Sequence, residues 1–211
     1  MEKELFNKTG TTTIAVVCKD GVVLATDRRV TMGYMIASRK FEKVSILNED
    51  TALTMAGLVS DAQLLTKIIK AQLRLDTIRR GKKPSTKEIA NLIGSLVYGN
   101  IRKFSAVPGI VGFMLAGRDD KGYHLYDIGV DGSVTEQEEY FCEGSGSEFA
   151  LGVLESGYNK DVNIDEGVKL ALKALNSAIQ RDIASGSGYD VVTITKDGAK
   201  KLLEKEIKFT I

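Results

Sequence analysis

The feature that most restricts the fold is a pair of neighbouring runs that have no polar face. Residues 11–18 are almost all β-branched or apolar, and residues 22–25 continue the pattern after the turn signal Lys19-Asp20-Gly21. A strand that is apolar on both sides must be covered on both faces. We therefore expect a buried β-hairpin near the start of the chain, with a further layer on each side of its sheet.

Other strand-like runs alternate with helical patterns along the rest of the chain. The further strands are predicted at 35–37, 43–46, 52–56, 110–116, 123–128, 140–142 and 191–195. Capping-box patterns that begin at Ser60, Ser85 and Asn163 each precede an apolar stripe at helical spacing, and a short helix is expected over 148–155. These patterns predict one α+β domain in which sheet packs on sheet and the helices lie outside.

Composition excludes several classes of function. The chain has 211 residues, enough for one domain, and its net charge of +1 argues against a nucleic-acid-binding surface. No apolar stretch approaches the roughly 20 residues of a membrane span, and the polar first ten residues do not look like a secretory signal. Cys18 and Cys142 are expected to be small core residues in a cytoplasmic protein. His124, the single histidine, is expected to be a surface or half-buried residue, so histidine-dependent catalysis is disfavoured.

Six short motifs, none of them specific alone, carry the functional argument. In order they are Gly10-Thr11-Thr12-Thr13, Ala25-Thr26-Asp27-Arg28-Arg29-Val30-Thr31, Lys43 at a strand start, Thr54-Met55-Ala56-Gly57, Gly144-Ser145-Gly146-Ser147 and Arg181-Asp182-Ile183-Ala184-Ser185-Gly186. Together they resemble the β subunit of the archaeal-type 20S proteasome, an N-terminal-nucleophile hydrolase. The resemblance covers about residues 11–195. It implies a four-layer αββα sandwich of two antiparallel sheets flanked by helices.

The chemistry of Thr11 can be argued without the family. A threonine hydroxyl is a weak nucleophile and needs a base. If residues 1–10 are removed at the Gly10–Thr11 bond, Thr11 gains an α-amine with a pKa of about 7.7–8.0, of which roughly a tenth to a third is unprotonated at neutral pH. An ordinary lysine would be unprotonated at only about one part in a thousand or less. We therefore expect a self-removed propeptide, 1–10, and a single catalytic domain, 11–211.

The resemblance implies roles for residues in the other motifs. Asp27 would hold Lys43 as a charged neighbour that lowers the pKa of the nucleophile and the amine, and the Gly57 N–H would bind the oxyanion. From the residues alone, a structural ion pair between neighbouring strands is the simpler interpretation of Asp27 and Lys43, and Gly57 could simply end a strand.

Two further groups of residues match the family pattern. Ser145, Asp182 and Ser185 match the group that supports the nucleophile. Arg29, Val30, Thr31, Met55 and Val59 match positions of the substrate cleft, where backbone groups of Thr31 would pair with an extended peptide. The apolar types of Val30, Met55 and Val59 favour cleavage after hydrophobic residues over cleavage after acidic ones.

The expected function is that of a threonine endopeptidase that hydrolyses unfolded polypeptides inside a chamber. The resemblance implies heptameric rings of β subunits, α-subunit rings that cap them, an ATP-dependent unfoldase as partner, and no metal or organic cofactor. Two alternatives stay open. One is a structural β subunit that does not cleave, and the other is the bacterial two-ring threonine protease that shares the Thr-Thr start.

Overall fold

The computed structural model describes residues 10–207, and the expected buried hairpin lies in the first of its two main sheets. This sheet has the order β10-β1-β2-β11-β12, and the second sheet has the order β5-β6-β7-β8-β9. The strands of the first sheet are β10 (Tyr140–Gly144), β1 (Thr12–Cys18), β2 (Gly21–Asp27), β11 (Gly188–Thr195) and β12 (Gly198–Glu206). Those of the second are β5 (Val44–Asn48), β6 (Thr51–Gly57), β7 (Val111–Asp119), β8 (Gly122–Ile128) and β9 (Val134–Gln137). All neighbouring strands in both sheets run antiparallel.

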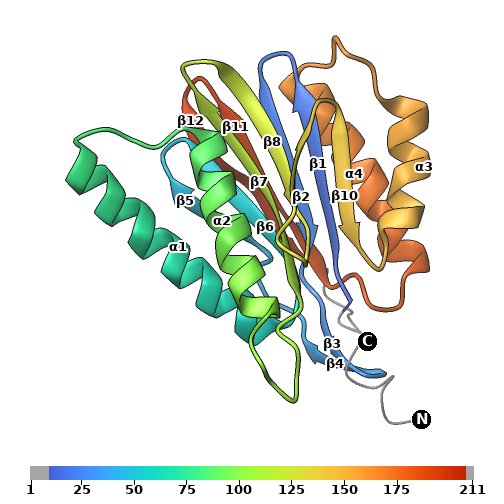
Figure 1. Cartoon of the computed structure of the whole chain (residues 1–211). Coiled ribbons are helices and arrows are strands. Elements are labelled where there is room, and N and C mark those ends of the chain that lie inside the picture. Colours follow the sequence, from blue (N-terminus) through green and yellow to red (C-terminus); the bar gives the residue numbers. More distant parts are fainter. Residues whose placement is uncertain (1–9, 208–211) are drawn as a thin grey trace.

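The two sheets stack face to face and helices cover their outer faces (Figure 1). The helices α1 (Val59–Arg80) and α2 (Thr86–Ile101) pack on the second sheet. The helices α3 (Ser147–Gly157) and α4 (Ile164–Arg181) pack on the first. A third apolar cluster, which includes Ala15, Leu24 and Met114, fills the space between the sheets. The expected α+β, αββα sandwich is confirmed.

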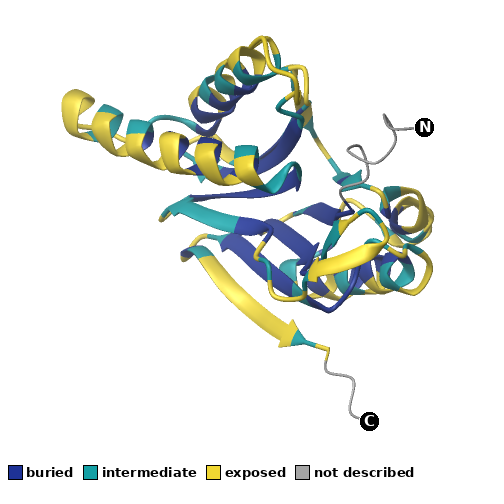
Figure 2. Ribbon diagram, turned by 90° about the horizontal axis from the view of Figure 1, so that it is seen from below, coloured by how far each residue is buried: buried dark blue, intermediate teal, exposed yellow. Residues whose placement is uncertain are grey.

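Burial follows this layering. Every residue of β2 is buried, and Val17 is the one residue of β1 that keeps partial exposure. Figure 2 shows the buried residues concentrated on the strands, whereas the outer side of α1 and most of β12 are exposed. A strand that is apolar on both sides is stable only in such a layered interior.

The antiparallel order brings several strand ends to the same edge of the first sheet. Thr12 at the start of β1 pairs with Gly144 at the end of β10, and Thr13 pairs with Thr26 near the end of β2. Asp27 pairs in turn with Tyr189 at the start of β11. Residues far apart in the sequence therefore meet around Thr11.

Two of the three expected capping boxes are confirmed. The Ser85 hydroxyl accepts the N–H of Glu88 and the Asn163 side chain accepts that of Glu166, and each glutamate reaches back to the cap residue's N–H. The box at Ser60 is wrong: α1 begins at Val59, and the Ser60 hydroxyl donates to Asp61 Oδ2 (3.1 Å).

The start of α1 is set by the preceding chain instead. Leu58 is its N-cap and makes no side-chain cap bond, while its own N–H donates to Ile110 O (2.8 Å). The helix thus continues directly from the end of β6. The Asp61 carboxylate binds the Asn100 amide (2.9 Å), so it serves the contact with α2.

Three observed strands are not predicted by the sequence, because they are too short or lack a sustained apolar alternation. They are β3 (Val30–Met32), β9 and β12, while β4 (Met35–Ser38), predicted at 35–37, pairs with β3 in a small separate hairpin. The sequence suggests only a charged surface run at 204–208, but residues 204–206 end the exposed edge strand β12. Backbone pairing with β11 makes this segment a strand, and the pattern of its own side chains does not.

Other expectations concern single residues. Cys18 and Cys142 are buried and free, and burial raises the pKa of each thiol to about 12. His124 is half-buried, with Nδ1 2.9 Å from Glu136 and Nε2 3.1 Å from Asp119. Within residues 10–207 no helix has the length and apolar character to cross a membrane. The expected propeptide lies outside the described residues except for Gly10.

Candidate active site

Thr11 lies immediately before β1 and is almost fully buried, with 4% of its surface exposed. Its N–H donates to Ser145 Oγ (3.3 Å), and its carbonyl oxygen accepts the N–H of Gly146 (3.5 Å). The next residue, Thr12, donates its N–H to Asp27 Oδ1 (2.9 Å). The backbone that carries the Thr11 side chain is therefore fixed by contacts to β2 and to the loop after β10.

Asp27 and Lys43 form a buried ion pair with a distance of 2.6 Å between Nζ and Oδ1. Asp27 Oδ2 accepts the N–H groups of Arg29 and Gly186, both at 2.9 Å. With Thr12 N–H and Lys43 Nζ on Oδ1, both carboxylate oxygens are saturated with donors. Burial lowers the pKa of Lys43, and the Asp27 carboxylate opposes that shift.

The carbonyl oxygen of Gly10 receives two donors from this group. Thr11 Oγ1 lies 2.8 Å from it and Lys43 Nζ lies 3.0 Å from it. The Gly10 N–H donates to Thr31 Oγ1 (3.2 Å). A Cβ at Gly10 would lie 1.8 Å from Ala184 Cβ, so the close approach of that loop requires glycine here.

Ser145, Asp182 and Ser185 form a second hydrogen-bonded group beside Thr11. Both serine hydroxyls donate to Asp182 Oδ2 at 2.6 Å. Ser185 Oγ also lies 2.7 Å from Thr12 Oγ1. Asp182 is the C-cap of α4 and Ser145 follows β10, so this group depends on the pairing of β10 with β1.

A pocket opens next to Thr11, and its lining includes four of the five residues expected in the cleft. These are Val30, Thr31, Met55 and Val59, and they share the pocket with Gly10, Thr11, Lys43, Gly57, Phe41 and Ala62. The fifth, Arg29, extends to the loop before β11, where its guanidinium donates to Ile183 O (2.7 Å) and Ser187 Oγ (3.3 Å).

Sequence reasoning missed two pocket residues, Phe41 and Ala62. Ala62 could have been found, because it lies three residues after Val59 and therefore on the same face of α1. No pattern in the sequence points to Phe41. Its place follows from the hydrogen bond between its N–H and Arg28 O (3.1 Å).

Gly57 ends β6 with a φ of +121°, a conformation that side chains rarely adopt. A Cβ there would lie 2.3 Å from Ile110 O. We expect Gly57→Ala to destabilise the fold by about 2 kcal/mol or more and to distort the pocket. Melting temperature and peptide hydrolysis measure the two effects.

Gly99→Ala provides the matched control. Gly99 lies in the exposed part of α2, and a Cβ there would meet no heavy atom within 4 Å. This change is expected to stabilise the helix by about 0.5–1 kcal/mol. A Gly57→Ala variant that melts and reacts like Gly99→Ala would show that the site tolerates a side chain at residue 57.

Comparison with known proteins gives a consistent result. The family model described as "Proteasome subunit" matches residues 7–194. The "Proteasome subunit beta" of Ferroglobus placidus is 45% identical over 199 residues, which cover 94% of this chain and 93% of that protein. The protein of the same description from Archaeoglobus profundus is 44% identical, with 94% and 90% covered. That of Halorubrum lacusprofundi is 46% identical, with 90% and 76% covered. With this likeness over nearly its whole length, the chain belongs to the proteasome subunit family as a β-type subunit, one that assembles with other subunits into proteasome particles.

Proposed function

We propose that this β subunit is proteolytic: once residues 1–10 are removed, Thr11 acts as an N-terminal nucleophile that hydrolyses peptide bonds of unfolded proteins. The observation that carries the proposal is that two polar groups converge on one peptide unit. Lys43, paired with Asp27, contacts the Gly10 carbonyl, while Ser145, bonded to Asp182, contacts the Thr11 nitrogen.

Removal of the propeptide is the first reaction. Thr11 Oγ attacks the carbonyl carbon of Gly10, the C–N bond breaks, and the nitrogen of Thr11 takes up the proton that the hydroxyl loses, so that it becomes an amine. Water then hydrolyses the resulting ester, which leaves a Gly10 carboxylate and a free Thr11. In the precursor the Thr11 nitrogen is an amide and cannot act as a base. Lys43 Nζ, 3.0 Å from Gly10 O, is placed to polarise that carbonyl.

The mature reaction repeats this chemistry on a substrate. Thr11 Oγ attacks the substrate carbonyl while the new α-amine accepts the hydroxyl proton, and the Gly57 N–H binds the developing oxyanion. The substrate C–N bond then breaks, the leaving nitrogen takes the proton from the α-amine and departs as an amine, and water hydrolyses the remaining ester to a carboxylate and free Thr11. Ser145 orients the nitrogen of Thr11, since it already accepts that N–H in the uncut chain. Asp27 keeps Lys43 in place.

The lining of the pocket favours hydrophobic residues before the cleaved bond. Apart from Lys43, whose charge is paired with Asp27, its side chains are chiefly apolar. The apolar side chains are Val30, Phe41, Met55, Val59 and Ala62. An acidic residue in such a pocket would lose its hydration without gaining a free cation.

The proposed particle has heptameric rings of β subunits, capped by α-subunit rings and supplied with substrate by an ATP-dependent unfoldase. These partners are proposed from the family to which the chain belongs. No metal or organic cofactor takes part in the proposed reaction.

Two measurements on the assembled particle test this function. The intact mass of the subunit is expected to equal that of residues 11–211. Because the pocket is chiefly apolar, peptides that end in a hydrophobic residue are expected to be cleaved at least about tenfold faster than those that end in an acidic one. A tenfold difference corresponds to about 1.4 kcal/mol of discrimination. A particle that keeps residues 1–10 and cleaves no peptide would support the structural β subunit. Rings of six subunits in electron-microscope averages would support the bacterial two-ring relative.

A further inference from the structure

We propose that a partly buried charge cluster beside the active site sets the position of Asp27 relative to Lys43, a proposal that rests on the proposed function. The cluster, here called the Arg28 cluster, consists of Arg28, Glu42, Asp190, Lys201 and Glu204. Arg28 directly follows Asp27 in the chain, and Glu42 directly precedes Lys43. The Arg28 cluster therefore includes the residue next to Asp27 and the residue next to Lys43 in the sequence.

Arg28 fixes the end of β2 against the strands next to it. Its side chain is 5% exposed, and Nη1 donates to Glu204 Oε1 on β12 (2.8 Å). Its Nε lies 3.5 Å from Asp190 Oδ2 on β11, and the Asp190 side chain is fully buried. The N–H of Arg28 donates to Gly186 O (3.1 Å), in the same loop that supplies an N–H to Asp27.

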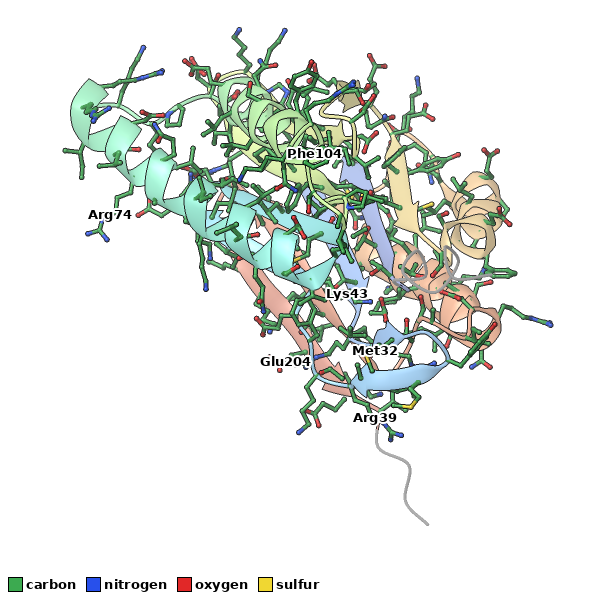
Figure 3. All side chains as sticks on the ribbon, turned by 60° about the horizontal axis from the view of Figure 1, so that its bottom comes forward. Met32, Arg39, Lys43, Arg74, Phe104 and Glu204 are labelled. Atoms are coloured by element: carbon green, nitrogen blue, oxygen red, sulfur yellow. The ribbon has the colours of Figure 1, made fainter. Side chains whose placement is uncertain are left out.

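Lys201 fixes the segment that leads to Lys43. Its Nζ lies 2.6 Å from Glu42 Oε1, 2.7 Å from Glu204 Oε2 and 3.2 Å from Asp190 Oδ1. Because Glu42 precedes β5, this contact joins the second sheet to β11 and β12 of the first. Lys43 and Glu204, both labelled in Figure 3, mark the two sides of this junction.

The Asp27–Lys43 pair crosses between the same two sheets. Asp27 ends β2 of the first sheet, whereas Lys43 directly precedes β5 of the second. The distance of 2.6 Å between them therefore depends on the spacing of the sheets at this end. A misplacement of about 1 Å can reduce a reaction rate by roughly 100-fold, so a link that fixes the spacing acts on the reaction through position. Residues of the Arg28 cluster are thus positioning residues.

The test compares Lys201→Met, Glu42→Gln and Lys201→Arg in assembled particles, with a fluorogenic peptide that ends in a hydrophobic residue as substrate. The side chains of Lys201 and Glu42 are 30% and 56% exposed, so these changes disturb the core less than changes at Asp190 would. Arg80→Met, which removes an exposed pair with Glu88, is the matched control. We expect Lys201→Met to lower kcat at least tenfold and Glu42→Gln to lower it about threefold, each with KM within twofold of wild type. Lys201→Arg is expected to restore at least half of kcat, and Arg80→Met to leave it unchanged.

The outcomes separate this proposal from the proposed function. If wild-type particles hydrolyse the peptide and Lys201→Met and Glu42→Gln keep kcat within twofold, the positioning role is refuted while the proteolytic function stands. A rise in KM with unchanged kcat refutes it as well, because it would place the effect on substrate binding. Should Lys201→Met particles fail to assemble, Glu42→Gln alone decides by the same criterion. Wild-type particles without activity would overturn the proposed function and this proposal together.

Discussion

Particles that carry Thr11→Ala are expected to hydrolyse peptides about 1,000-fold more slowly than wild type, or slower still. The change removes the Oγ atom that lies 2.8 Å from the Gly10 carbonyl oxygen, on a backbone held by the bonds of Thr11 N–H to Ser145 and of Thr12 N–H to Asp27. Initial rates with a fluorogenic peptide that ends in a hydrophobic residue measure the effect.

Thr11→Ala removes the nucleophile and also blocks removal of the propeptide, so two controls are needed. A Thr11→Ala chain produced from residue 11 onward exposes the amine without the hydroxyl and is expected to stay inactive. Thr11→Ser keeps both groups and is expected to retain measurable hydrolysis and processing. Activity within tenfold of wild type in either Thr11→Ala particle would show that another residue carries the reaction.

The layers of the fold could be predicted because they depend on local patterns. The runs around Ala15 and Leu24 have no polar face, and this property requires cover on both sides wherever the strands lie. The cap at Ser60 was wrong because a contact between distant segments, Leu58 N–H to Ile110 O, decides where α1 begins. Local sequence contains no information about that contact.

The site could be predicted only through the resemblance to a family. Ser145 and Asp182 are separated by 37 residues and meet because β10 pairs with β1 and α4 packs on the same sheet, an arrangement that no short motif encodes. Thr11 stands out by its chemistry, but the place of Phe41 in the pocket and the contacts of Arg29 with Ile183 do not follow from any pattern. Residues whose partners come from other strands therefore need the structure.

Variants of the Asp27–Lys43 ion pair are expected to show the second large loss of activity. They also test whether the pair supports the reaction or only the fold. Asp27→Asn puts an amide NH₂ opposite two donors in either orientation, because each carboxylate oxygen accepts two hydrogen bonds. It also leaves the buried Lys43 without a counter-charge. We expect it to destabilise the fold by about 3–5 kcal/mol and to lower kcat at least about 100-fold. Lys43→Met is expected to act similarly, since it leaves a buried carboxylate unpaired.

The double variant Asp27→Asn/Lys43→Met decides between the two roles. Without either charge, the unpaired-ion cost disappears, so its melting temperature is expected to exceed that of both single variants. Its kcat is nevertheless expected to stay at least about 100-fold below wild type, because the variant lacks the Nζ that lies 3.0 Å from the Gly10 carbonyl oxygen beside Thr11. Lys83→Met, which removes half-exposed pairs with Glu49 and Asp50, is the control and should change stability by about 1 kcal/mol or less. If the double variant recovered activity together with stability, Asp27 and Lys43 would be a structural ion pair, and the electrostatic support for Thr11 and its α-amine would have to come from Ser145 and Asp182.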